Sequence, residues 1–200
     1  PERSAKAIYF THLTPPASKT FSNGGLIDVS VDKDKSIALY EDAEEEGVLY
    51  VVPYDNVSGT AVNDQVIYFN EDCDYMFANL MKIEEILLDN VNTDAMATTV
   101  SMFETKSAYL TELDLMNMTT PNLLASDEMF ANNPVLTTIY MGEETQEAVE
   151  FQDLPVAILA KTSTRFLYAN DLSDEDFWFD AVNDFDYSFQ YSTYNESVEA

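Results

Sequence analysis

The chain is poor in the residues that build reactive or metal-bound centres. Among its 200 residues there is one cysteine, Cys73, and one histidine, His12. A single cysteine excludes an intramolecular disulfide, and the two residues together are too few for a clustered Cys/His metal site. Cys73 lies between Asp72 and Asp74, whose charges raise a thiol pKa, so we predict a packed thiol and not a nucleophile. His12 precedes a Pro-Pro loop, and we predict that it is a surface loop residue.

Positive charge is also scarce. Lysine and arginine number 9 against 37 aspartates and glutamates, which gives a formal net charge of -28. Such a surface repels phosphate, so anionic lipid headgroups are poor partners and we predict no nucleic-acid partner. Hydrophobic residues make up 46% of the chain and aromatic residues 12%, which is enough for a packed core. The acidic side chains are therefore expected on the surface of a folded protein.

Long apolar runs are missing as well. No stretch approaches the roughly 18 apolar residues of a membrane span, so we predict no membrane insertion. The first residues, PERSAKAIYFTHLTPP, contain only AIYF as an apolar run, which does not match a secretory signal. Two histories stay open: a signal was removed, or Pro1 follows an excised initiator Met in a cytoplasmic protein.

Residues 1–71 are predicted to form an N-terminal β region. Short apolar and β-branched runs alternate with turn residues, as in a meander or small sandwich. The run LIDVSV places Ile27, Val29 and Val31 on one side and polar residues mostly on the other, which predicts a half-buried strand. The predicted strands are AKAIYF, LIDVSV, SIALYE, GVLYVVPY and QVIYF.

Residues 72–141 contain a repeat. Met-Phe pairs begin at Met76, Met102 and Met129, with spacings of 26 and then 27 residues. Each pair is followed by the pattern LxxLxL, which predicts one short strand per unit of a stacked coil, with the Met-Phe pair sealing the opposite side. The ladder positions are Ile83, Ile86, Leu88, Leu110, Leu113, Leu115, Leu136, Ile139 and Met141.

The units MFANLMKIEEILLDNVNT, MFETKSAYLTELDLMNMTT and MFANNPVLTTIYM resemble the BspA-type leucine-rich repeats of bacterial surface proteins. With the lead-in segments upstream, the resemblance covers about residues 36–141, as two full repeats and a truncated third. The usual Asn-Val-Thr-x-Met before each Met-Phe is replaced here by ATTVS or LASDE. The resemblance implies adhesion or assembly on an exposed surface, and it supplies no catalytic residues.

Residues 142–200 form an acidic and aromatic C-terminal section. PVAILA and RFLYA are predicted strands, and a capping pattern predicts a short helix over Asp174–Val182. The alternating residues Phe185, Tyr187, Phe189 and Tyr191 predict a strand with one aromatic face, which we take as the candidate interaction surface. That strand either packs on the N-terminal sheet of its own chain or adds to the sheet edge of a neighbouring subunit.

Catalytic and metal sites have weaker support. A pair of carboxylates could act in a hydrolase, but the sequence does not show which two would lie at the required separation. The segment DKDKS begins like a calcium loop, yet Ile37 and Ala43 stand where an EF-hand needs glycine and glutamate, so we predict a turn. Weak calcium or sodium binding at residues 42–46 or 171–176 is an alternative to solvated charge runs. No cofactor is predicted.

These patterns predict a strand-rich α+β protein: an N-terminal β region, a short leucine-rich-repeat-like coil and an acidic-aromatic C-terminal section. We predict a non-enzymatic, exposed structural or protein-interaction module that forms a homo-oligomer or larger assembly with other protein subunits. The favoured setting is an extracellular particle, such as a phage virion decoration or fibre protein. A secreted or cell-surface bacterial adhesion module is the first alternative, and an acid-pair hydrolase is the second.

Overall fold

The computed structural model describes residues 5–55, 57–58, 60–62, 65–126, 128–136 and 138–141, and the strands Arg165–Ala169 and Phe189–Thr193. The strands are β1 Ala7–Phe10, β2 Ile27–Asp28, β3 Ile37–Glu41, β4 Val48–Asp55, β5 Thr60–Ala61, β6 Ile67–Tyr68, β7 Glu85–Leu88, β8 Val91–Asn92, β9 Glu112–Leu115, β10 Thr138–Met141, β11 Arg165–Ala169 and β12 Phe189–Thr193.

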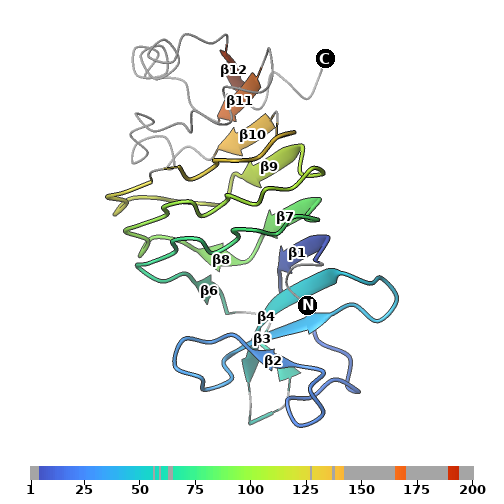
Figure 1. The fold of residues 1–200 in the computed structure, drawn as a ribbon. Helices are drawn as coiled ribbons and strands as arrows, with labels where there is room; N and C mark the ends of the chain where they lie inside the picture. The colour runs from blue at the N-terminus through green and yellow to red at the C-terminus, as the bar shows by residue number, and fades with distance from the viewer. Residues whose placement is uncertain are drawn as a thin grey trace.

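One mixed sheet runs along the molecule. Its order is β12-β11-β10-β9-β7-β1-β4-β3-β2, with β5 paired to β4 (Figure 1). From β12 to β4 all neighbours are parallel, and β3 and β2 continue the sheet in antiparallel pairing. The N-terminal strand β1 lies between β4 and β7, so the N-terminal strands and the repeats share one sheet.

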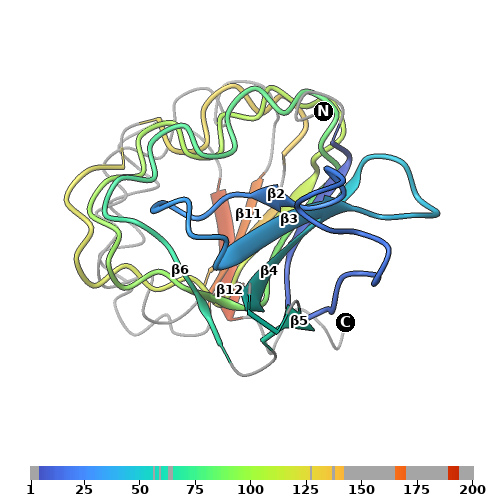
Figure 2. The same cartoon turned by 90° about the horizontal axis from the view of Figure 1, so that it is seen from below.

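The repeats wind into a coil with three sides. The main sheet forms one side, and β6 and β8 pair in parallel on a second. The third side, called here the wall, consists of the stacked segments 71–80, 97–105 and 128–132, each of which contains a Met-Phe pair. Figure 2 looks along the coil from below and shows the turns superposed around a common interior.

The core lies between the main sheet and the wall. Along β7 and β9 every second residue is buried, and Ile86, Leu88, Leu113 and Leu115 point inward. Eight predicted ladder residues, from Ile83 to Ile139, are buried, which confirms their predicted place; the side chain of Met141 lies outside the described residues. Burial of such a ladder holds the units together, because one unit alone cannot cover its apolar face.

The wall contributes a stack of phenylalanines to this core. The rings of Phe77 and Phe103 are 5.2 Å apart at 16°, and those of Phe103 and Phe130 are 5.7 Å apart at 12°. All three rings are buried, so the prediction that the Met-Phe pairs seal the coil is confirmed for the phenylalanines. The repeat period therefore places one ring directly on the next.

Buried polar groups inside the coil are paired between units. The Asn133 side-chain amide donates to the carbonyl oxygens of Phe103 at 2.6 Å and Phe130 at 2.8 Å, and its oxygen accepts from Thr105 Oγ1 at 2.6 Å. Thr93 Oγ1 donates to Thr119 O at 2.7 Å on another corner. These bonds satisfy groups that would otherwise be buried without partners, so they fix the vertical register of the coil.

The predicted α+β class is wrong for this fold. No helix occurs among the described residues, and the strands form mainly a single mixed sheet. The wall changes direction at single residues whose φ lies in the left-handed region, including Tyr75 (φ 58°), Ser101 (φ 52°) and Glu128 (φ 54°). These changes of direction follow one another too closely for a helix to form between them. The predicted helix Asp174–Val182 lies outside the described residues. Within the described part, no helix is long and apolar enough to cross a membrane.

The strand predicted over LIDVSV is shorter than expected, and the opposite set of side chains is buried. Leu26 and Ser30 are buried, whereas Ile27, Val29 and Val31 are exposed. The physical reason is a turn built by Asp28, whose Oδ1 accepts from Ser30 Oγ at 2.5 Å and from Ser30 N at 3.0 Å. These bonds end β2 at Asp28 and leave two valines on the surface.

Candidate binding groove

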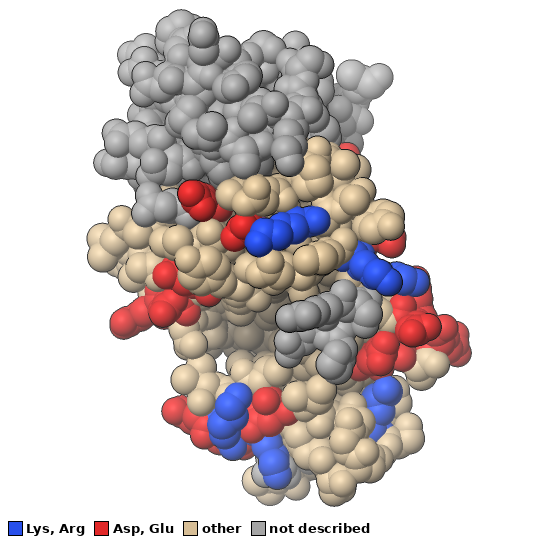
Figure 3. All heavy atoms as spheres, viewed as in Figure 1, with Lys and Arg blue, Asp and Glu red and all other residues tan. Residues whose placement is uncertain are grey.

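The main sheet extends further toward the N-terminal end of the molecule than the wall does. The first wall segment, residues 71–80, stacks on the second, residues 97–105, through backbone hydrogen bonds. Beyond it the sheet continues through β1, β4, β3 and β2, whose inner face meets no further wall segment in the described part of the chain. A groove of about 540 Å³ lies at this step. Figure 3 shows a recess between the N-terminal strands and the stacked coils.

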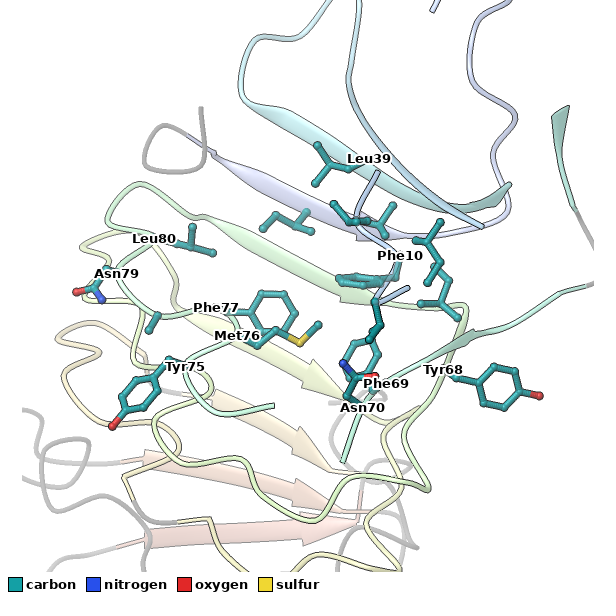
Figure 4. Close-up of a pocket in the computed structure, with 17 residues that line it drawn as sticks. Phe10, Leu39, Tyr68, Phe69, Asn70, Tyr75, Met76, Phe77, Asn79 and Leu80 are labelled. Atoms are coloured by element: carbon teal, nitrogen blue, oxygen red, sulfur yellow. The ribbon is translucent and has the colours of Figure 1, made fainter. Parts of the chain in front are cut away.

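Both sides of the groove are mainly apolar. The sheet side is built from the inward residues of three strands and from the segment after β2, and the opposite side is the first wall segment with the residues after β6 (Figure 4). On the sheet side lie Phe10, Val29, Val31, Ile37 and Leu39. Facing them are Phe69, Met76, Phe77 and Leu80, whereas the ring of Tyr75 points away from the groove (Figure 4). A concave, largely apolar site of this size is typical of binding pockets.

Phe10 forms the rigid centre of the groove. Its ring meets Phe69 at 5.3 Å and 61°, and Phe77 at 6.0 Å and 89°, both edge-to-face. Such aromatic pairs are favourable beyond the area that they bury. Because β1 holds Phe10 between two parallel neighbours, this part of the groove is preformed by the sheet.

The rim of the groove exposes large apolar side chains. Val31 is 66% exposed, Tyr68 is 69% exposed and Tyr75 is 59% exposed, and Val29 and Met76 are also exposed. Single exposed apolar residues are ordinary, but several around one groove indicate a contact surface.

A second, more polar recess of about 720 Å³ adjoins the groove and shares Val31, Ile37, Tyr68 and Asn70 with it. Its lining includes Asp32 and Asp34. Hydrogen bonding, above all from Ser36, lowers the pKa of Asp34, which therefore stays ionised at neutral pH. The composite site thus combines an apolar groove with an acidic end.

The residues predicted as the interaction surface lie elsewhere. Phe185 and Tyr187 are outside the described residues, and Phe189 and Tyr191 belong to β12. Tyr191 is in register with Leu167 of β11, which is in register with Ile139 of β10. Strand β12 therefore pairs within its own chain, at the opposite end of the sheet from the groove.

The other singled-out residues occupy structural positions. Cys73 is buried in the wall, its Sγ donates to Asn70 O at 3.3 Å, and burial raises its pKa to about 11. His12 is exposed. The DKDKS segment is a turn, as predicted, with Lys33 and Lys35 at positive φ.

The acidic run 42–46 is an exposed turn. Asp42 Oδ1 accepts from Glu44 N at 2.7 Å and from Glu45 N at 3.0 Å, and these bonds lower the pKa of Asp42. The described residues contain no group of three or more metal-ligating side chains.

Several carboxyl groups have a pKa below the usual range because local donors bond them. They are Asp28, Asp34, Asp42, Asp55 and Asp94. A glycosidase-type acid pair needs the opposite shift in one member, which must stay protonated at working pH. The lowered pKa values of these five groups fit carboxylates that accept hydrogen bonds within turns or between neighbouring units.

Comparison with known proteins gives no matching family model, no matching curated protein and no matching solved structure. The resemblance of residues 36–141 to BspA-type repeats therefore stays a prediction from the sequence.

Proposed function

We propose that this chain is a non-enzymatic protein-interaction module, and that it attaches to other protein subunits through the groove at the N-terminal end of its coil. The observation that carries the proposal is the step between sheet and wall, where Phe10, Val31 and Leu39 face Met76 and Phe77. An exposed apolar groove on a rigid scaffold gains free energy when a partner covers it.

The setting that we propose is an extracellular particle such as a phage virion decoration or fibre, as the short acidic coil suggests. A net charge of -28 keeps such a component soluble and discourages nonspecific contacts, so that association depends on a specific apolar site. A stacked coil suits this role because each unit contacts only its neighbours and the ends stay available.

Fractionation of the source organism tests the proposal. The chain is expressed from its own gene with Val31→Asp, which places a charge on the groove rim, or with Val57→Asp as the matched control. Val57 is 96% exposed and does not line the groove. We expect the wild type and Val57→Asp to sediment with a large particle, and Val31→Asp to stay in the supernatant as a folded chain.

Two results would overturn the proposal. One is a wild-type chain that remains a free monomer in every fraction; the other is a Val31→Asp chain that enters the particle as well as the wild type does. Recovery of the wild type with the cell envelope would favour the adhesion setting over the particle.

A further inference from the structure

The first wall segment has one hydrogen-bonding edge that no other described residue uses. The N–H groups of Cys73, Tyr75, Phe77 and Asn79 donate to the carbonyl oxygens of residues 98, 100, 102 and 104 of the second wall segment, at 2.9 to 3.0 Å. The same bonds recur one unit later, where Thr99 N donates to Ala125 O at 2.9 Å and Phe103 N to Met129 O at 2.7 Å. Each wall segment thus donates in one direction and accepts from the other.

The direction of the remaining carbonyl groups follows from peptide geometry. All described peptide bonds are trans, so the carbonyl of one residue points opposite to the N–H of the next. The carbonyls of Asp72, Asp74, Met76 and Ala78 therefore point away from the second wall segment. They correspond to the accepting carbonyls of residues 98–104, yet no described residue donates to them.

These carbonyls point toward the groove end of the molecule. Met76 and Ala78 themselves line the groove, which lies beyond the first wall segment. A row of acceptors at every second residue, beside an apolar floor, matches what an added wall segment requires. The backbone supplies the affinity, and the inward side chains of the added segment enter the groove.

We propose that the groove binds a polypeptide segment of a partner protein, which continues the wall by one further segment; this rests on the proposed function. Alternate N–H groups of the segment donate to the carbonyls of Asp72, Asp74, Met76 and Ala78. Its inward side chains, at the positions that match the buried residues Cys73, Phe77 and Leu80 of the first wall segment, are apolar and pack between Leu39 and Phe77.

The charges around the site specify the rest of the segment. Asp72 lies on the accepting edge, and Asp32 and Asp34 line the adjoining recess. An acidic segment would be repelled by these groups and by the net charge of -28, whereas lysine or arginine at outward positions would be attracted. The partner segment is therefore basic at its outward positions.

A synthetic wall peptide tests this mode of binding. The probe is a capped ten-residue peptide with the sequence of residues 71–80, in which lysine replaces the three acids and valine replaces the cysteine. Two N-methylated forms are compared with it by isothermal titration of the full chain. One carries methyl groups on the amides that match residues 73, 75, 77 and 79, and the other on those that match 72, 74, 76 and 78.

We expect the unmodified peptide to bind, and methylation of the first set to weaken binding by about tenfold or more, because each lost bond removes part of the affinity. Methylation of the second set leaves affinity within about threefold. Val31→Asp weakens the unmodified peptide, Val57→Asp does not, and a peptide that keeps the native acids binds more weakly at low salt than at high salt.

Three results would overturn the inference. They are equal binding of both methylated forms, which means a side-chain site only; no binding of the lysine peptide; and a wild-type chain whose groove is covered by a second copy of itself, seen as a dimer that Val31→Asp dissolves. The fractionation experiment measures attachment to a particle independently of the peptide. A chain that fails the peptide test can therefore still be a particle component.

Discussion

Phe10 and Phe77 meet edge-to-face across 67 positions of sequence, with 6.0 Å between ring centroids and 89° between ring planes. This contact joins the N-terminal strand to the repeats, because Phe77 begins the stack that continues through Phe103 and Phe130. The same two rings form the inner end of the groove. Stability of the coil and shape of the proposed site therefore depend on one aromatic column.

We expect the centre of that column to be a sensitive core position. Phe103 is 0% exposed and stacks on a ring at each side. We expect Phe103→Ala to lower the free energy of unfolding by about 3–5 kcal/mol, because it removes buried area and leaves a cavity. Urea unfolding measures this. Leu124→Ala, at a side chain that is 86% exposed, should change stability by less than about 0.5 kcal/mol.

Asn133 supports the coil through polar contacts. Replacement by leucine keeps the volume similar but leaves two buried carbonyls and the Thr105 hydroxyl without this partner. We expect a loss of about 2–3 kcal/mol in the free energy of unfolding. Asn122→Ala is the control, since Asn122 is exposed and donates one bond, to Asp94 O at 2.8 Å. Equal losses for both variants would contradict the assigned role of Asn133.

The tyrosines on the outer face of the sheet predict a loss of stability in alkali. Burial raises the pKa of Tyr40 to about 12, and burial together with the Glu85 hydrogen bond raises the pKa of Tyr9. Between pH 10 and 12 the folded chain then holds more protons than the unfolded chain, so stability falls as pH rises. Below pH 10 this contribution is fully present.

Urea unfolding at pH 9 and pH 11.5 measures the effect. Tyr40→Phe should lose less stability over this interval than the wild type does, whereas Tyr109→Phe, at an exposed position, should follow the wild type. A Tyr40→Phe profile identical to the wild type would show that Tyr40 does not contribute.

Salt should stabilise the fold. The formal charge of -28 produces self-repulsion that is greatest in the compact state, and added salt screens it. We expect the melting temperature to rise between low and moderate NaCl concentrations. An unchanged melting temperature would mean that the carboxylates are spaced too widely to repel one another appreciably.

The sequence predicts the repeats well and the N-terminal end poorly. The ladder residues such as Leu110 and the wall rings such as Phe103 follow from a fixed period, and a period is visible in a single sequence. The insertion of β1 between β4 and β7 is a long-range parallel pairing, and no local pattern specifies it. Residues 27–31 alternate in the expected way, but the bonds of Asp28 reverse which side is buried.

The groove was missed for the same reason. Its two sides come from segments that are remote in sequence, and its exposed valines resemble the core face of a strand. The sequence holds one signal of the groove. The strand predicted over LIDVSV runs directly into the turn DKDKS, and a strand so close to a turn has little room to pack its apolar side chains. Phe189 and Tyr191 lie in a strand, β12, as predicted. Their role as an interaction surface stays a prediction.

Methyl-detected NMR of the full chain titrated with the lysine wall peptide tests the central claim most directly, because it locates the binding site. We predict saturable shifts confined to the methyl groups that line the groove, among them those of Val29, Val31, Leu39, Met76 and Leu80, with Leu124 and Val57 unchanged. Shifts that centre on the opposite end of the sheet, or that spread evenly over the molecule, would contradict a binding groove between sheet and wall.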